Sequence, residues 1–244
     1  MDAAWSRPFV AWPRRDSPVS LATWLREVVE FVRMRGAQVP YPADAPRGQG
    51  EPVIVVPAFL SPDSSTASLR AFLAHQGFEP ECWNCGMNLG PMRRAVVQLD
   101  HRVREIAQRH RRKVSLVGIS LGGTLAREAA KRCRECVARV VTLASPINMP
   151  VVTPLAPFAR LAATFWDGTA EAAFEHIAEA PPVPLTAIVS HTDGVVDWRA
   201  CMPQPARGVE TVLISGAHMT IAANAEALRV VAARLAGRPH GPGA

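Results

Sequence analysis

Lysine is scarce in this chain, although the chain as a whole is basic. Lys113 and Lys131 are the only lysines among 27 lysines and arginines, and the formal net charge is +6. Proteins that bind nucleic acid usually cluster their basic residues and interleave them with aromatic side chains. The densest basic run here, residues 109–113, precedes an apolar segment and is typical of a solvated helix end, where cations suit the helix dipole. We therefore interpret the arginine excess as a bias of composition and expect no nucleic-acid partner.

Long apolar runs are also missing. No segment of the sequence has the roughly 18 uninterrupted apolar residues that a membrane span needs. Residues 1–8 lack the basic region and following apolar run of a signal peptide. These absences predict no stable membrane insertion and a cytoplasmic location. Hydrophobic residues make up 48% of the chain and charged residues 20%, which predicts a globular protein with a sizeable core.

Cysteine is sparse and odd in number. The five cysteines are Cys82, Cys85, Cys133, Cys136 and Cys201. An odd count without a signal peptide predicts reduced thiols. Two pairs have the C-x-x-C spacing, but they lie 48 residues apart, whereas the pairs of a zinc ribbon are separated by about 15–20 residues. We therefore predict that the thiols are incidental, and we expect neither a metal nor another cofactor.

The 244 residues suit a single domain in which strands and helices alternate. Short apolar runs rich in β-branched residues predict strands that are buried on both faces. The expected strands cover residues 53–56, 78–83, 114–117, 139–143, 185–189 and 210–214. The expected helices cover residues 20–35, 63–76, 93–110, 121–132 and about 220–235. This alternation predicts an α/β fold with a mainly parallel sheet, whose reactive groups gather at the carboxyl ends of the strands.

Two segments of the expected single domain, residues 1–244, lie outside the alternation. Residues 1–50 are predicted to be an N-terminal helical extension, with a helix over residues 20–35 that Ser20 can cap. Residues 148–184 contain six prolines and a short amphipathic stretch. We interpret them as a cap or lid inserted over the sheet edge. A surface loop with one packing helix is an equally open alternative.

The most informative stretch of the sequence surrounds Ser120. Gly118, Ser120 and Gly122 form the pattern G-x-S-x-G, between a predicted strand and a predicted helix. In a nucleophile elbow this context holds the serine on a sharp turn, with its hydroxyl exposed. The residues two positions to either side must be small because the strand and the helix pass close to them. We therefore predict that Ser120 is a nucleophile.

A serine hydroxyl needs a histidine base, and the base needs an acid that orients it. Where this turn carries the nucleophile, the chain order is serine, then Asp or Glu, then histidine. His218 follows the last predicted strand and precedes the last helix, so we predict that it is the base. Asp193 follows the penultimate strand and is the favoured acid, with Asp197 as the alternative. Either aspartate could instead be a turn residue bonded to its own backbone.

Two backbone amides are candidates for binding an oxyanion. The N–H of Leu121 lies at the start of the predicted helix and has no partner within that helix. The second donor is expected in the loop after the first central strand, and we place it at Phe59. The sequence supports this position and not the identity of the side chain.

These segments together resemble bacterial α/β-hydrolases of the esterase/lipase group. The resemblance lies in the elbow, in the loop 57–60 and in the segment 190–196 with His218, and it extends over about residues 52–235. Residues 82–91 resemble a loop of a poorly characterised set of these proteins. The resemblance implies that Ser120, Asp193 and His218 are nucleophile, acid and base, with the amides of Phe59 and Leu121 as oxyanion donors. The chain departs from many relatives at Ala58, where they have glycine, and at Ile119, where they have an aromatic residue.

The predicted function is hydrolysis of a carboxylic ester through an acyl-enzyme, with a small-molecule ester as partner. Apolar residues in the first loop and in the insertion suggest an apolar acyl group of short to medium length. The predicted substrate-binding residues are Leu60, Met149, Phe158, Phe165 and Trp166. An acyltransferase or a thioesterase with the same triad is an alternative, and so is a non-catalytic scaffold that binds a ligand or partner.

Overall fold

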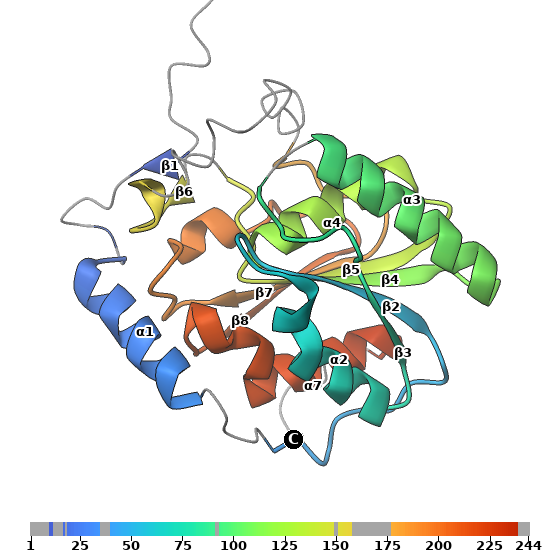
Figure 1. Ribbon diagram of the computed structural model, residues 1–244, viewed down its shortest axis with the longest axis horizontal. Coiled ribbons are helices and arrows are strands. Elements are labelled where there is room, and N and C mark those ends of the chain that lie inside the picture. The colour runs from blue at the N-terminus through green and yellow to red at the C-terminus, as the bar shows by residue number, and fades with distance from the viewer. Residues whose placement is uncertain are drawn as a thin grey trace, which may run out of the picture.

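A six-stranded parallel sheet forms the centre of this protein in the computed structural model (Figure 1). The structure describes residues 10–11, 17, 19–34, 40–90, 93–148, 151–157 and 177–238. The strands are β2 (Pro52–Val56), β3 (Glu79–Cys82), β4 (Val114–Ile119), β5 (Val137–Leu143), β7 (Leu185–Ser190) and β8 (Val209–Ile214). Their order across the sheet is β3-β2-β4-β5-β7-β8, and each neighbouring pair is parallel.

The central strands are apolar on both sides of the sheet. In β2, Val53 and Val55 belong to the core on one face, whereas Ile54 and Val56 belong to the core on the other. This division follows from the strand geometry, because successive side chains point to opposite faces. All four residues are fully buried. Helices cover both faces, so these strands need an uninterrupted apolar run, which is the pattern that the sequence shows.

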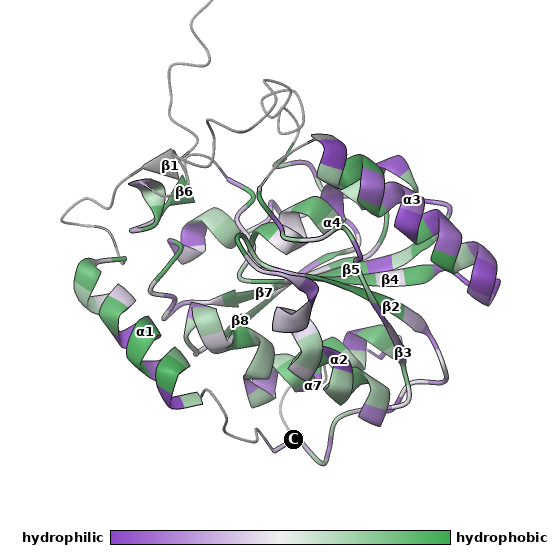
Figure 2. Ribbon diagram, viewed as in Figure 1, coloured by the Kyte–Doolittle hydropathy of each residue, from purple (hydrophilic) through white to green (hydrophobic). Residues whose placement is uncertain are grey.

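Helices pack on both faces of the sheet. One face is covered by α2 (Ala67–His75) and α7 (Ala225–Leu235), and the other by α3 (Arg93–His110) and α4 (Leu121–Arg132). Figure 2 shows largely hydrophobic strands between helices of mixed hydropathy. This arrangement confirms the predicted α/β class with a parallel sheet flanked by helices.

The first helix, α1 (Leu21–Met34), lies beside the end of the sheet formed by β7 and β8 (Figure 1). Ser20 precedes it, and the two residues Ser20 and Thr23 cap each other. The Ser20 hydroxyl accepts the Thr23 N–H at 3.2 Å, and the Thr23 hydroxyl accepts the Ser20 N–H at 2.8 Å. The helix packs against η3 (His218–Ala223), a 3₁₀ segment that follows β8. The N-terminal helix therefore contacts the segment that begins with His218.

Several predicted boundaries differ from the structure. The helix expected from about residue 220 begins at Ala225, because Asn224 has an extended backbone (φ −68°, ψ 126°). Its side chain accepts the N–H groups of Glu226 and Ala227 and so caps α7. The helix expected over residues 63–76 begins with a 3₁₀ turn, η1 (Asp63–Thr66). The strand expected from residue 139 begins two residues earlier, at Val137.

A second, two-stranded sheet does not appear in the sequence-based expectation. It pairs β1 (Val10–Ala11) in parallel with β6 (Val151–Val152). Strands of two residues carry no periodicity that a sequence pattern could reveal. Since β6 lies inside the segment 148–184, this pairing joins the start of the chain to the predicted insertion.

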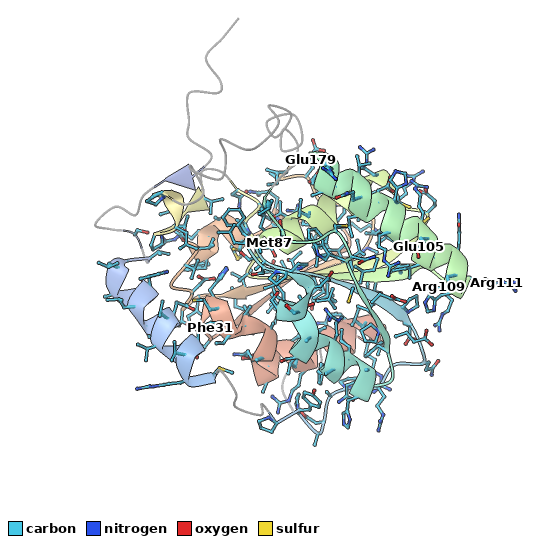
Figure 3. The ribbon with its side chains drawn as sticks, in the orientation of Figure 1. Phe31, Met87, Glu105, Arg109, Arg111 and Glu179 are labelled. Carbon is cyan, nitrogen blue, oxygen red and sulfur yellow. The ribbon has the colours of Figure 1, made fainter. Side chains whose placement is uncertain are left out.

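The exposed side of α3 carries charge, as Glu105 and Arg109 show in Figure 3. The basic run that closes this helix faces acidic residues of β3. Arg109 forms an ion pair with Glu81, and His110 Nδ1 lies 3.0 Å from a carboxylate oxygen of Glu79. Among the helices of the described residues, none is both long enough and apolar enough to cross a membrane.

We predict that Leu99→Ala lowers the free energy of unfolding by about 3 kcal/mol, since it removes a fully buried side chain between α3 and the sheet. Urea denaturation followed by circular dichroism measures this change. Gln108→Ala is the control, because Gln108 is exposed on the same helix, and we expect a change within about 0.5 kcal/mol. Equal effects of the two substitutions would contradict the packing described for α3.

Candidate active site

Four loops that leave the carboxyl ends of parallel strands meet at one edge of the sheet. Phe59 follows β2, Ser120 follows β4, Asp193 follows β7 and His218 follows β8. A cavity of about 590 Å³ opens there, and Phe59, Ser120, Leu121 and His218 are among its lining residues. The topology places the loops together because all six strands run in the same direction.

Ser120 occupies a strained turn between β4 and α4. Its backbone has φ 52° and ψ −126°, a conformation that L-residues rarely adopt. A Cβ added at Gly118 would lie 2.3 Å from the Cα of Gly123. A Cβ added at Gly122 would lie 2.4 Å from the carbonyl oxygens of Val56 and Pro57. The two outer glycines of the motif are therefore required by the close approach of the strand, the helix and the β2 loop.

The turn is anchored through its backbone and not through the serine side chain. The Ser120 N–H donates to the Leu143 carbonyl at 2.7 Å, and the Ser120 carbonyl accepts the Gly123 N–H at 2.9 Å. The Ser120 hydroxyl makes no hydrogen bond to another residue of the described chain, and the residue lines the cavity. The Ser120 hydroxyl is therefore available to a ligand that enters the cavity.

His218, which lines the cavity, forms a buried pair with Asp193. The imidazole Nδ1 lies 2.5 Å from Oδ2 of Asp193. The other carboxylate oxygen accepts the N–H groups of Val195 and Val196, both at 2.8 Å. Asp193 thus bonds its own turn and the histidine at the same time. Because Nδ1 donates to the carboxylate, Nε2 is left as the acceptor of the neutral ring.

Asp197, the alternative acid, has a different role. Its carboxylate accepts the Arg199 N–H at 3.1 Å and caps η2 (Trp198–Cys201). It also lies 3.6 Å from the Arg199 guanidinium. The structure therefore places Asp193, and not Asp197, against His218.

The surroundings of His218 favour its charged form. Burial disfavours protonation of the ring, but the negative charge of Asp193, its hydrogen bond and the charge of Glu27 together outweigh that effect. The pKa of His218 is consequently raised above its usual value of 6.5. A site of this kind can accept a proton at the histidine and stabilise the resulting cation.

Two backbone amides border the cavity beside Ser120. The N–H groups of Phe59 and Leu121 make no hydrogen bond to another residue in the described part of the chain. The next amide in the first loop behaves differently, since the Leu60 N–H donates to the Asn88 carbonyl at 2.7 Å. Leu60 has φ 56°, so the loop turns sharply after Phe59. Phe59 and Leu121 therefore remain the two available donors that the sequence predicted.

Asn88 holds the first loop in place, a role that sequence reasoning missed. It is fully buried, and its side-chain amide donates to the Pro57 carbonyl at 2.7 Å. Its backbone N–H donates to the Ser61 carbonyl at 3.1 Å, in addition to the bond that its carbonyl accepts from Leu60. The segment 82–91 stood out in the sequence only as a resemblance, and no local pattern there indicates which loop it contacts.

Comparison with known proteins identifies the fold. No protein-family model and no curated protein matches the chain. The mature form of a lipase from Bacillus licheniformis superposes with a TM-score of 0.60 at 16% identity, covering 80% of this chain and 96% of the lipase. Aspergillus fumigatus lipase B gives 0.58 at 17% identity, covering 80% and 55%. The thioesterase domain from the curacin biosynthetic pathway gives 0.50 at 13% identity, covering 77% and 93%.

This chain has the α/β-hydrolase fold. The elbow after β4, the aspartate after β7 and the histidine after β8 stand in the order that this fold uses for its triad. At the identities found, the likeness establishes the fold and leaves the activity to be argued from the site.

The cavity of this α/β-hydrolase fold has mainly apolar walls. The helix α1 contributes Trp24, Val28 and Phe31 to them, and Phe31 is labelled in Figure 3. The sequence predicted residues 1–50 only as an extension. The apolar face of α1 indicated that the helix must pack against something, but an amphipathic pattern does not name its partner.

Of the predicted substrate-binding residues, Leu60 lines the cavity and is half exposed. The others, Met149, Phe158, Phe165 and Trp166, lie outside the described residues. Parts of the predicted lid segment 148–184 that the structure does describe also contribute to the walls. These are Val151, Thr153, Leu155 and Ile177.

One group of possible metal ligands lies at the end of α4. Ligand atoms of Cys133, Glu135 and Cys136 lie within 4.8 Å of one another. Glu135 already forms an ion pair with Arg104 at 2.8 Å. A structural zinc site takes four ligands, one more than this group supplies. The group belongs to one of the two C-x-x-C pairs and is not among the lining residues of the cavity.

We predict that Gly122→Ala destabilises the fold by about 2 kcal/mol, because the added methyl group meets two backbone carbonyls and overpacking outweighs the helix propensity of alanine. Gly86→Ala is the control: Gly86 has φ 79°, but an added Cβ meets no atom within 4 Å. We expect about 1 kcal/mol there, from the backbone conformation alone. Urea denaturation measures both, and an effect no larger at Gly122 than at Gly86 would refute the steric account.

Proposed function

We propose that this protein is a serine hydrolase that cleaves carboxylic esters through an acyl-enzyme. Ser120 is the nucleophile, His218 the general base, and Asp193 the acid that orients the base. One observation carries the proposal: the hydroxyl on the strained turn and the histidine bonded to a buried aspartate line the same apolar cavity. Such a constellation is recognised by its geometry and by the roles of its members.

In the first half of the reaction, Ser120 Oγ attacks the ester carbonyl carbon, and its proton moves to His218 Nε2. Asp193 stays ionised and stabilises the imidazolium. The carbonyl oxygen becomes an oxyanion, which accepts hydrogen bonds from the amides of Phe59 and Leu121. The bond to the leaving alkoxy group then breaks, and His218 gives its proton to that oxygen, so an alcohol departs and an acyl-Ser120 ester remains.

In the second half, water takes the place of the alcohol. His218 removes a proton from the water, whose oxygen attacks the acyl carbon, and the same two amides hold the new oxyanion. The bond to Ser120 Oγ breaks, and the proton returns from His218 to the serine. The products are the free carboxylic acid and the regenerated hydroxyl.

The cavity indicates the class of ester. A volume of about 590 Å³ lies within the range of small-molecule sites, and the walls offer few polar groups besides Ser61, Ser65, Thr153 and the proposed catalytic residues. We propose apolar acyl or aryl groups of short to medium length. Leu60 is the described member of the substrate-binding set predicted from the sequence.

Thioester cleavage and acyl transfer use the same acyl-enzyme, and one structural neighbour is a thioesterase domain. Thioester cleavage differs from ester hydrolysis in its leaving group, which is a thiol. Acyl transfer differs in its acceptor, which is an alcohol in place of water. Including an acyl-thioester and an added alcohol acceptor in the assays below separates the three activities by their products.

We expect the wild type to hydrolyse p-nitrophenyl esters and Ser120→Ala to lose activity on the order of 10⁶-fold, because the nucleophile is removed. The assay runs a chain-length series from acetate to palmitate, and the optimum reports the size of the acyl site. Ser68→Ala is the control, since Ser68 is an exposed serine on α2 that does not line the cavity.

A fluorophosphonate probe tests the nucleophile independently of the substrate. It should label Ser120 in the wild type and in Ser68→Ala, and mass spectrometry should find no label in Ser120→Ala. Absence of labelling in the folded wild type would indicate a non-catalytic scaffold. Equal activity of Ser120→Ala and wild type would show that the elbow is not the reaction centre.

The rate should fall on the acid side of neutrality. His218 must be neutral to accept a proton, and its pKa is raised above 6.5 by Asp193 and Glu27. We therefore expect kcat/KM to rise with pH through a midpoint above 6.5. A profile of kcat/KM from about pH 5 to pH 9 measures this midpoint for the free enzyme. A midpoint at or below 6.5 would contradict the proposed environment of the base.

A further inference from the structure

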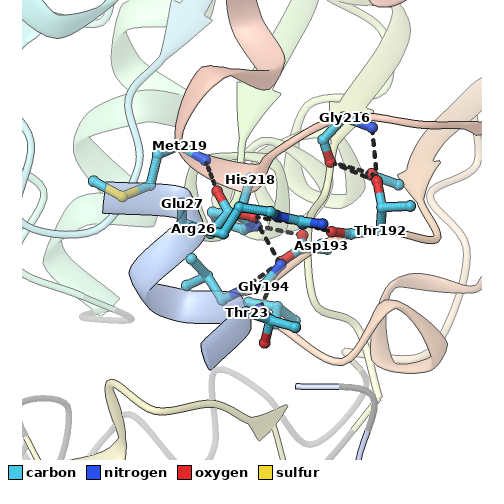
Figure 4. Close-up of polar contacts among 12 residues, drawn as sticks. Thr23, Arg26, Glu27, Thr192, Asp193, Gly194, Gly216, His218 and Met219 are labelled. Atoms are coloured by element: carbon cyan, nitrogen blue, oxygen red, sulfur yellow. Dashed lines mark hydrogen bonds and ion pairs between the residues drawn. The ribbon is translucent and has the colours of Figure 1, made fainter. Parts of the chain in front are cut away.

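Glu27 is a fully buried carboxylate that belongs to α1 and not to any of the strand loops. Its two oxygens reach two different loops. Oε1 accepts the Gly194 N–H at 2.7 Å, and Oε2 accepts the Met219 N–H at 3.0 Å (Figure 4). Gly194 follows Asp193 in the chain, and Met219 follows His218. A single side chain therefore ties the backbone next to the proposed acid to the backbone next to the proposed base.

The rest of α1 fits closely against the loop that carries Asp193. A Cβ added at Gly194 would lie 2.5 Å from the Thr23 carbonyl oxygen and 2.7 Å from Cγ of Glu27, so a side chain there would push the helix away. Arg26, the residue before Glu27, donates a hydrogen bond from its guanidinium to the Thr192 carbonyl. Figure 4 shows these contacts converging on the segment around Asp193 and His218.

We propose that Glu27 is a positioning residue, whose ionised carboxylate holds the Asp193 and His218 loops in register and places a second negative charge near the imidazole. This inference rests on the proposed function, since it gives Glu27 a role in the same reaction. Glu27 does not line the cavity, so it acts through the two loops and not on the substrate.

The hydrogen bonds of Glu27 are those that a carboxylate makes. Both oxygens accept from backbone N–H groups, and a carboxylate is an acceptor at both, whereas a protonated carboxyl group presents a donor at one of them. Burying a charge is costly unless it is paired and hydrogen-bonded. Two amide donors and the Arg26 guanidinium, 3.9 Å from Oε1, supply that compensation.

The charged and titratable groups around His218 come from three elements. Asp193 lies in the loop after β7, and Glu27 with Arg26 lies on α1. Cys201 lies behind Asp193 on η2, and burial together with Asp193 and Asp197 raises the pKa of its thiol well above the usual range, so it stays neutral. Asp193 and Glu27 are thus the two anions that favour the imidazolium, which supports the proposal.

The test compares Glu27→Gln with Glu30→Gln. Glutamine keeps the shape of Glu27 but removes the charge and turns one acceptor into a donor that faces an amide N–H. We expect kcat to fall on the order of 10²-fold with little change in KM, because small displacements of catalytic groups cost about that much. The acid limb of the pH profile should also move to lower pH. Glu30 lies one turn further along α1 and has no partner among the described residues, so its variant should match the wild type.

A second readout does not depend on turnover. Titration of the His218 imidazole by NMR should give a lower pKa in Glu27→Gln than in the wild type and in Glu30→Gln. If the wild type neither hydrolyses esters nor reacts with the fluorophosphonate, the proposed function fails, while this titration still reports on Glu27. A folded Glu27→Gln with wild-type kcat, pH profile and titration overturns the inference.

Glu27→Asp covers the case in which the glutamine variant does not fold. Aspartate keeps the charge but is shorter by one methylene, so it cannot span both amides. We expect a lowered kcat together with a His218 titration close to that of the wild type. An unchanged kcat in this variant would overturn the positioning role.

Discussion

The close approach of β4, α4 and the loop after β2 is the constraint on which the rest of the site depends. At this crossing no side chain fits at Gly118 or at Gly122, since an added Cβ at either position would lie within 2.4 Å of backbone atoms. The backbone of Ser120 consequently turns through a conformation that is unfavourable for an isolated residue. Buried strands on both sides hold it there, and its amide bonds the end of β5. Local strain is thus maintained by the packing of the whole sheet.

Electrostatics organises the loops that follow β7 and β8. Two buried carboxylates, Asp193 and Glu27, each have both oxygens engaged, by backbone amides and by the imidazole of His218. A buried charge is tolerated only where its acceptor sites are filled, so both groups order the loops that supply their donors. The charge arrangement that stabilises a cationic histidine is therefore the same arrangement that holds its loop in place.

The helix α1 contributes both to the wall of the cavity and to the electrostatic contacts around His218. Its residues Trp24, Val28 and Phe31 form part of the cavity wall, while Glu27 on the same helix bonds the loops that carry Asp193 and His218. A segment that precedes the central sheet in the sequence thereby completes a cavity whose other walls come from loops far along the chain. The fold of the sheet is common to many hydrolases, but the shape of this cavity depends on how this helix is docked.

The amino-acid sequence was sufficient to predict the parallel α/β architecture, the helices over residues 93–110 and 121–132, and the sharp turn at Ser120, because each depends on local periodicity or on steric demands within a few residues. It also named Asp193 and His218, since chain order and strand ends restrict the candidates. The three-dimensional structure was needed to show that His218 bonds Asp193 while Asp197 caps η2. It alone also placed Asn88 under the first loop and Glu27 between two others. Apart from the local cap by Asp197, these contacts join residues between 25 and 192 positions apart, and no local pattern encodes which distant backbone group a buried side chain will meet.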